Sequence, residues 1–520
     1  MASIIPSSLP PFDVLRTTAD DLRKLLKSGG ISSVQIVECY LSHIEAHNTN
    51  GAKCRAIIST PPRIQLIACA ARLDKERQEG KLRGPMHGIP VLLKDNIATD
   101  PSLGMATTVG SYALRDSCPF GNAPVVDNLV HRGLIILGKA NLTEFVGLKG
   151  VSGWSAIGGM CEPAYIPTGY ETGEKSRGET TPAGSSTGSA VGVACGFAPV
   201  SLGTETSGSV VSPAAAAALY ALKLTPGSVP LAGIMEVNAF FDTVGAFGKS
   251  ALDVALVCDA FSVTKDGSNL TSFASSVNLK DVSVGFVDIE KWRLPAHTQV
   301  GDPKYFEQTA TEYREAKDQL RKNGVKVVDV YLQPPEECMI GDTNVDDLMN
   351  IMIMQQGKNG FERYLNSLEV SKVRTLAEII KFNEDNADIE LHKDYSPNQD
   401  LLTKLLNDSK PDEDVSEWLE HCKRWGATEG IDKITSEHAV DVVVCCSDSY
   451  FAGVSVAARY PMAAVPLGYI KSSGRPYGLQ AIAPAYQESK LVRFMAAWEQ
   501  VFPPRRVPDL DACAKSRADR

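Results

Sequence analysis

The sequence predicts an α/β protein in which helices and buried strands alternate along the chain. Short, mostly apolar runs rich in valine are separated by glycine turns and by stretches with helical periodicity. Such runs suit strands that are buried on both faces of a sheet. A helix that starts at Asp302 and Pro303 leads through Gly324 into one of them, a succession typical of layered α/β folds. The expected strands are Pro90–Leu93, Leu134–Leu137, Val282–Val287, Val325–Val330 and Asp441–Cys446.

The N-terminal segment is expected to be helical. Thr18 is a candidate helix N-cap, and Gly29–Gly30 would end that helix. Ser32 or Ser33 opens a second helix with an apolar stripe, and a charged third helix covers about Ile67–Glu79.

We expect one composite domain over residues 1–520. Its parts are an N-terminal helical segment (1–80), an α/β core (84–335 and 440–505) and a helical insertion (336–440). The insertion is acidic and rich in Met and Asn, and we expect it to lie on the sheet over the active site. Residues 478–482 are the expected last strand, and Glu488–Val501 is the expected last helix.

Composition and charge exclude several functional classes. The net charge of −10 and the pI near 5.5 argue against a nucleic-acid partner, which needs a basic surface. The twelve cysteines have no metal-ligand spacing, so we expect reduced thiols, no metal site and no cofactor. No signal peptide is evident at the N-terminus, and no apolar run is long enough for a membrane span. These features predict a cytoplasmic protein; a homodimer is compatible with the sequence.

Two serine-containing segments carry the strongest functional signal. Residues 182–190 read Pro-Ala-Gly-Ser-Ser-Thr-Gly-Ser-Ala, and residues 203–214 read Gly-Thr-Glu-Thr-Ser-Gly-Ser-Val-Val-Ser-Pro-Ala. Serine and glycine tracts are usually flexible linkers. Here the first tract continues into apolar small residues that suit an interior helix and strand, where a linker would serve no purpose. Ser185 and Ser209 are therefore candidate catalytic residues.

Two motif matches in the same region are misleading. Gly184-Ser-Ser-Thr-Gly188 fits the nucleophile elbow Gly-x-Ser-x-Gly, which would make Ser186 the nucleophile. That elbow needs a strand directly before it, whereas the preceding residues are a polar loop, and no histidine stands out as a base. Residues 133–140 resemble a phosphate-binding loop, but the residues between the two glycines are hydrophobic.

A lysine could supply the base that a serine nucleophile needs. Lys94 follows the apolar run Pro-Val-Leu-Leu, and burial would keep its amine neutral. Taken alone, Lys94 would be an ordinary strand-end lysine that reaches solvent. Around Ser209, successive backbone N–H groups could hold an oxyanion; these belong to Thr206, Ser207, Gly208 and Ser209.

These segments identify a resemblance to the amidase signature family, closest in motif to its peptide amidase-like subgroup. The similarity covers roughly residues 15–335 and 440–500 and preserves the 24-residue spacing of the two serines. It implies a three-layer α/β/α sandwich on a large mixed β-sheet. It also implies that Ser209 is the nucleophile, Ser185 the proton bridge and Lys94 the base, with the oxyanion hole formed by the backbone of residues 206–209. A cis peptide bond before Ser185 is implied as well.

The chain departs from the family pattern around this core. Glu205 replaces an aspartate and Val211 replaces an arginine, two changes that the peptide amidase-like subgroup shares. Ser207 stands where that subgroup tends to have aspartate, Thr187 replaces glycine or serine, and Ile157 stands where relatives often carry arginine. The polar loop at about 165–181 is long, and we expect the substrate pocket to depend on residues 150–181 and on the insertion.

The sequence therefore predicts an amidase that cleaves a linear carboxamide of a small molecule to an acid and ammonia or an amine. An acyl-enzyme on Ser209 would be the intermediate. An acyltransferase or esterase that uses the same acyl-enzyme is an alternative. A non-catalytic homologue, or a subunit of a transamidating complex, is another.

Overall fold

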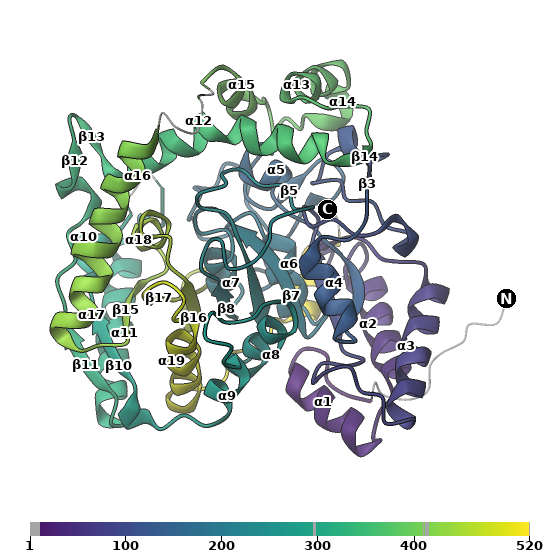
Figure 1. Ribbon diagram of the computed structural model, residues 1–520, viewed down its shortest axis with the longest axis horizontal. Coiled ribbons are helices and arrows are strands. Elements are labelled where there is room, and N and C mark those ends of the chain that lie inside the picture. The colour runs from purple at the N-terminus through teal and green to yellow at the C-terminus, as the bar shows by residue number, and fades with distance from the viewer. Residues whose placement is uncertain (1–10, 295–297, 409, 411–414, 519–520) are drawn as a thin grey trace.

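An eleven-stranded mixed sheet forms the middle of the molecule (Figure 1). The computed structural model describes residues 11–294, 298–408, 410 and 415–518; the first ten residues, part of the segment that shows no secretion signal, lie outside this range. In spatial order the strands are β1 (Ile57–Ser59), β4 (Ile135–Ala140), β2 (Pro90–Lys94), β7 (Val200–Glu205), β9 (Thr243–Gly248), β8 (Tyr220–Lys223), β16 (Met462–Tyr469), β17 (Pro476–Ile482), β15 (Val442–Cys446), β10 (Ser283–Phe286) and β11 (Lys326–Asp329).

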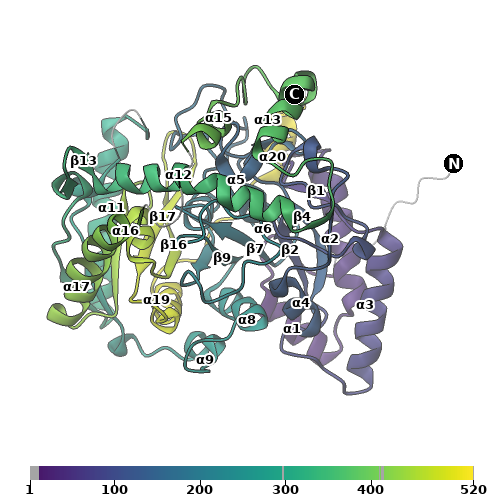
Figure 2. The same ribbon diagram turned by 45° about the horizontal axis from the view of Figure 1, so that its top comes forward.

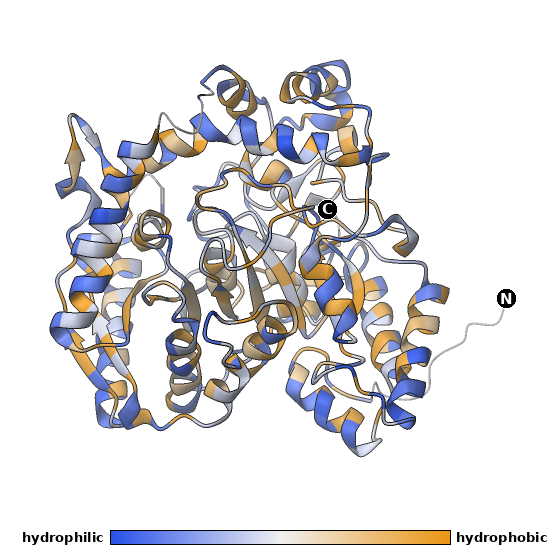
Figure 3. Ribbon diagram, in the orientation of Figure 1, coloured by the Kyte–Doolittle hydropathy of each residue, from blue (hydrophilic) through white to orange (hydrophobic). Residues whose placement is uncertain are grey.

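Helices cover both faces of this sheet, which gives the expected three layers. One face packs against α1 (Ala19–Ser28), α4 (Pro124–His131), α8 (Ala251–Phe261), α9 (Leu270–Ser275), α11 (Pro303–Lys322) and α19 (Glu488–Val501). The other packs against α6 (Thr187–Ala194), α7 (Val211–Ala216), α18 (Phe451–Ala458) and α17 (Asp432–His438). Hydrophilic and hydrophobic residues alternate along the peripheral helices (Figure 3), as expected when one helix face meets a core.

The remaining elements lie outside these layers. Near the N-terminus they are α2 (Ser33–His47) and α3 (Arg63–Gln78), which pack against each other. Shorter elements are β3 (Cys118–Pro119), α5 (Glu144–Gly147), β5 (Trp154–Ser155), β6 (Gly159–Met160) and α10 (Ile289–Trp292). None of the helices in the described ranges combines the length and the apolar character needed to cross a bilayer.

The predicted helix ends are confirmed. Thr18 and Asp21 form a reciprocal capping box, and Gly29 ends α1 in the left-handed conformation. Ser32, one of the two candidates, caps α2. The side chain of Asp302 accepts a hydrogen bond from the backbone N–H of Lys304 at the start of α11.

The expected strands are all present, but Lys326–Asp329 is not buried on both faces. Its four residues are exposed or half-buried because β11 lies at the edge of the sheet. The N-terminal segment is also not purely helical, since β1 pairs antiparallel with β4 at the opposite edge. A three-residue strand is too short to produce a recognisable periodicity in the sequence.

Glu488–Val501 is not the last helix. A further helix, α20 (Leu510–Ser516), follows it. The adjoining Arg517 is buried and donates hydrogen bonds to the carbonyl oxygens of Ala52 and Pro163, each at 2.8 Å. A buried arginine side chain therefore anchors the C-terminal end, which a charged tail sequence did not indicate.

The segment expected as an insertion is mostly helical. It contains β12 (Met339–Ile340), β13 (Thr343–Asn344), α12 (Val345–Asn366), β14 (Leu368–Val370), α13 (Leu376–Asp385), α14 (Ala387–Glu390), α15 (Asp400–Asn407), α16 (Ser416–Lys423), the π-helical η6 (Arg424–Ile431) and α17. Figures 1 and 2 show α12 as a long rod on the side of the molecule where α13 and α15 lie.

A buried ion triad joins this segment to the core. The Lys149 ammonium lies 2.7 Å from the Glu144 carboxylate and also pairs with Glu390 of α14, and all three side chains are inaccessible to solvent. Glu390 additionally accepts hydrogen bonds from the Ser111 hydroxyl and the Tyr112 backbone N–H, both at 2.8 Å. These contacts fix α14 over the loop that contains Lys149.

We predict that Lys149→Met destabilises the protein by about 3–5 kcal/mol, because it leaves two carboxylates buried without a cation. Urea unfolding of the variant and of the parent chain measures the loss. Lys372→Ala is the matched control: Lys372 also bridges the helical segment to the core, at 2.7 Å from Asp116, but that pair is exposed. Equal unfolding midpoints for Lys149→Met and the parent chain would contradict the structural role of the triad.

Candidate active site

The carboxyl ends of two neighbouring parallel strands bring the candidate residues together. Lys94 is the last residue of β2, and Glu205 is the last residue of β7, its parallel neighbour. Ser209 lies in the turn between β7 and α7, and Ser185 lies just before α6. Open α/β sheets bind ligands at this edge, where loops converge above the strand ends.

Lys94 and Ser185 are in direct contact. The Lys94 Nζ atom lies 2.7 Å from Ser185 Oγ, and it also contacts Thr204 Oγ1 at 3.0 Å and the Thr204 carbonyl oxygen at 3.3 Å. The lysine side chain is completely buried. Asn96 supports the arrangement, because its side-chain amide donates to Thr204 Oγ1 at 3.0 Å.

Burial lowers the pKa of Lys94 to about 7, because the ammonium form loses its hydration; the carboxylates of Asp242 and Glu205 oppose this shift. Burial likewise raises the pKa of Asp242 to about 7, although Thr206 and two backbone N–H groups donate to it. Near neutral pH, a large fraction of Lys94 is therefore an unprotonated amine with a free lone pair.

The turn that carries Ser209 leaves several backbone donors available. Gly208 has φ +75°, a left-handed conformation that favours glycine. No described residue accepts a hydrogen bond from the backbone N–H of Ser207, Gly208 or Ser209. By contrast, the next two N–H groups, of Val210 and Val211, both donate to the Glu205 carboxylate, at 2.6 and 3.0 Å. This contact explains a longer acid at position 205: it caps the start of α7.

The two serine segments are tied to each other. The backbone N–H of Ser186 donates to the Ser209 carbonyl oxygen at 3.2 Å. Thr187 braces the first segment, because its hydroxyl donates to the carbonyl oxygens of Ala183 at 3.0 Å and Gly184 at 3.3 Å. The threonine departure thus has a structural role next to Ser185.

The cis peptide bond implied before Ser185 is absent: the described peptide bonds are all trans. The chain turns instead through two successive residues with positive φ, Ala183 at 59° and Gly184 at 63°. A side chain at position 184 would collide with Pro213, whose Cδ would lie 2.4 Å from the added Cβ.

Both misleading motifs are structural. Ser186 is buried, and its hydroxyl donates to the Thr204 carbonyl oxygen at 3.0 Å. Lys139, from the segment that resembles a phosphate-binding loop, lies within strand β4 and donates to Thr107 Oγ1 at 2.8 Å. Both polar side chains are therefore engaged by the protein itself.

A hollow of about 330 Å³ opens beside the two serines. Its wall contains Ser185, Ser209 and Ser207. The remaining lining residues are Thr143, Val146, Gly147, Leu148, Gly150, Ser152, Ser176, Arg177, Gly184, Thr206, Val237 and Ile353. The lining thus includes residues from the 150–181 region and one residue of α12.

The other departures have different surroundings. Val211 is buried in the hydrophobic core, whereas Ser207 is exposed at the mouth of the hollow. Ile157 is half-buried and does not line the hollow. Sequence reasoning missed Thr204, Asn96 and Asp242, which surround Lys94; isolated polar residues near strand ends give no signal that distinguishes them from other core polar residues.

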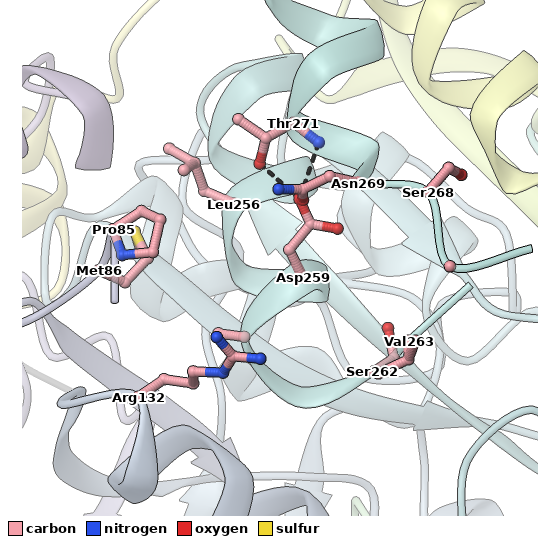
Figure 4. Close-up of a pocket in the computed structure, with 12 residues that line it drawn as sticks. Pro85, Met86, Arg132, Leu256, Asp259, Ser262, Val263, Ser268, Asn269 and Thr271 are labelled. Atoms are coloured by element: carbon pink, nitrogen blue, oxygen red, sulfur yellow. Dashed lines mark hydrogen bonds between the residues drawn. The ribbon is translucent and has the colours of Figure 1, made fainter. Parts of the chain in front are cut away.

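A second hollow, of about 220 Å³, lies elsewhere, between α8, α9 and the segment around Arg132 (Figure 4). Its carboxylate, Asp259, is occupied by the start of α9, because it accepts hydrogen bonds from the backbone N–H groups of Leu270 at 2.9 Å and Thr271 at 2.8 Å. This hollow shares no lining residue with the one beside Ser209.

The low pKa of Lys94 predicts a stability difference that depends on pH. The folded-state pKa of about 7 lies below the ordinary lysine value of 10.5, so between these values the unfolded chain binds the extra proton. Wild-type stability therefore gains up to about 1.4 kcal/mol per pH unit from this group as pH rises through that window. Lys94→Met removes the gain, and any stability advantage it has at pH 7 should shrink by pH 9.5. Urea unfolding at the two pH values measures this; a constant difference would contradict a neutral Lys94.

Comparison with known proteins gives one consistent assignment. A profile described as Amidase matches residues 35–492. Peptide amidase from Stenotrophomonas maltophilia superimposes with a TM-score of 0.83 and 31% identity, covering 95% of this chain and 99% of that one. A probable amidase of Arabidopsis thaliana is 29% identical over 96% of this chain and 92% of its own length. A glutamyl-tRNA(Gln) amidotransferase polypeptide of Streptomyces avermitilis is 26% identical over 94% of this chain and 96% of its own.

The profile match covers most of the chain, and the similarity to the peptide amidase structure agrees with the predicted subgroup and with the α/β fold. The chain belongs to the Amidase family and is an amide-hydrolysing enzyme.

Proposed function

We propose that the enzyme hydrolyses a linear carboxamide through an acyl-enzyme on Ser209. The observation that carries the proposal is the buried contact of 2.7 Å between Lys94 Nζ and Ser185 Oγ, with the lysine pKa lowered to about 7 by burial. A lysine in this state can accept a proton, which an ordinary ammonium cannot.

In the proposed reaction, Ser209 attacks the amide carbonyl while its proton passes to Ser185, whose own proton passes to Lys94. The backbone N–H groups of residues 206–209 stabilise the oxyanion, since those of Ser207, Gly208 and Ser209 have no acceptor within the described chain. The relay then returns the proton to the departing nitrogen. Water attacks the acyl-enzyme next, gives its proton to the same relay and releases the acid.

Acyl transfer is the alternative reaction, because an acyl-enzyme reacts with whichever nucleophile reaches it. The similarity to an amidotransferase polypeptide over nearly the whole chain favours keeping this alternative. Adding hydroxylamine during turnover separates the two: hydrolysis yields mostly free acid, and transfer yields mostly hydroxamate.

We predict that a fluorophosphonate adds one covalent group to the wild-type chain and none to Ser209→Ala, as measured by intact mass. Ser185→Ala and Lys94→Ala should label at least 100-fold more slowly, because general-base assistance is typically worth a factor of about 10²–10⁴. Ser186→Ala is the matched control, since this neighbouring hydroxyl is bound to the Thr204 carbonyl and should not be needed for labelling. Undiminished labelling of Ser209→Ala would refute the assigned nucleophile.

We also predict that kcat/KM falls as pH drops below about 7, where Lys94 becomes protonated. Glu205→Gln should move this acid limb to lower pH, because the Glu205 carboxylate raises the lysine pKa and the amide does not. Initial rates on a reactive amide between pH 5 and 9 measure the shift. An acid limb that stays in place, or moves to higher pH, would exclude Lys94 as its origin.

A further inference from the structure

Arg177 lies at the boundary between the catalytic hollow and a second, larger one. The catalytic hollow and a neighbouring hollow of about 580 Å³ share Ser176, Arg177 and Ser207 in their walls. Arg177 is also close to the nucleophile turn, because a Cβ added to Gly208 would lie 3.5 Å from Arg177 Nη2. Gly208 directly precedes Ser209, so the guanidinium stands beside the proposed reaction centre.

The polar loop before Ser185 holds Arg177 in this place. The backbone N–H of Arg177 donates to the Thr298 carbonyl oxygen at 2.8 Å, and the backbone N–H of Val300 donates back to the Arg177 carbonyl at 3.2 Å. Two backbone hydrogen bonds therefore fix the residue from which the side chain extends. The side chain itself is half-buried.

The guanidinium has no partner within the described chain. No described residue accepts a hydrogen bond from its side chain or forms an ion pair with it. The two acids whose charge it feels most are already engaged. Asp448 pairs with Arg475 at 2.7 Å, and Glu205 accepts the backbone N–H groups of Val210 and Val211.

This arrangement is unfavourable without a ligand. Burial lowers the pKa of Arg177, which shows that the charged form has lost hydration, but an arginine side chain stays protonated in proteins. A guanidinium presents five N–H donors in a planar fork that matches a carboxylate in two parallel hydrogen bonds. A bound carboxylate would supply the acceptors and the opposite charge that the protein does not.

The second hollow limits where such a carboxylate can lie. Its far wall contains Glu336, Asp346 and Asp347, all acidic, and its lining residues include no basic side chain other than Arg177. An anionic group that extended toward this wall would be repelled. The favourable position is therefore next to Arg177 and Ser207, within a few bonds of an amide carbonyl at Ser209.

We propose that Arg177 is a specificity-determining residue that binds a carboxylate of the substrate, so that the preferred substrates are carboxamides with a carboxylate a few bonds from the scissile amide. This inference rests on the proposed function for the position of the scissile bond. It assigns to the long polar loop the recognition of substrate charge, separate from the serine and lysine chemistry.

The test measures binding in the Ser209→Ala chain, where no turnover is needed. Calorimetric titration compares the monoamides of succinic, glutaric and adipic acid with the corresponding diamides, which have the same shape but no charge. We expect at least one acid to bind tenfold or more tightly than its diamide. Adding Arg177→Gln should abolish this preference, and Arg177→Lys should keep part of it because the charge remains.

Lys175→Gln is the matched control, because it removes one positive charge from the same loop at an exposed residue outside both hollows. It should leave the preference intact. The proposal is overturned if no acid is preferred to its diamide, if none binds, or if the preference survives Arg177→Gln.

Labelling by a neutral fluorophosphonate distinguishes this result from failure of the proposed function. If wild type labels at Ser209 but shows no acid preference, only the role of Arg177 falls. If the preference depends on Arg177 but Ser209 does not label, the binding site stands and the assigned nucleophile falls. Arg177→Gln in the chain that retains Ser209 should label at the wild-type rate, which shows that its loop is still folded.

Discussion

The burial of one lysine amine governs the organisation of the catalytic region. Lys94 ends a fully buried strand, and within the described chain its amine contacts Ser185 and the hydroxyl and carbonyl of Thr204. A charged amine in this place is costly, so the fold keeps the group largely neutral and surrounds it with hydrogen-bonding oxygen atoms. Asp242 and Glu205 moderate the effect, because their charges prevent the pKa from falling further.

Parallel pairing of β2 with β7 makes this arrangement possible. It places the lysine at the end of one strand beside the turn that leaves the other, and the hydrogen bond from Ser186 to the Ser209 carbonyl joins the second serine segment to that turn. Residues from distant parts of the chain thus meet through backbone geometry. The surrounding polar side chains, such as Thr187 and Glu205, then hold the turns rather than contact a ligand.

Much of the fold and of the catalytic centre could be predicted from the sequence. Capping residues such as Thr18 and valine-rich runs such as 441–446 have local signatures, and the paired serine segments have a specific pattern. The edge strand Ile57–Ser59 and the helix Leu510–Ser516 could not be found, since long-range pairing and packing stabilise them. The same holds for Thr204 and Asp242, whose importance comes only from their distance to Lys94. The trans bond before Ser185 differs from what the family resemblance implied, because positive φ at Ala183 and Gly184 already makes the turn.

The hollow beside Ser209 has walls of two different origins. Strand ends and the turns that follow them contribute the serines, whereas Ser176, Arg177 and Ile353 come from a surface loop and from α12. None of these last three residues contacts Lys94, Thr204 or Glu205 through a hydrogen bond within the described chain. Insertions and substitutions in those outer segments can therefore accumulate without disturbing proton transfer. A scaffold divided in this way allows new substrate preferences to evolve while the reaction itself is conserved.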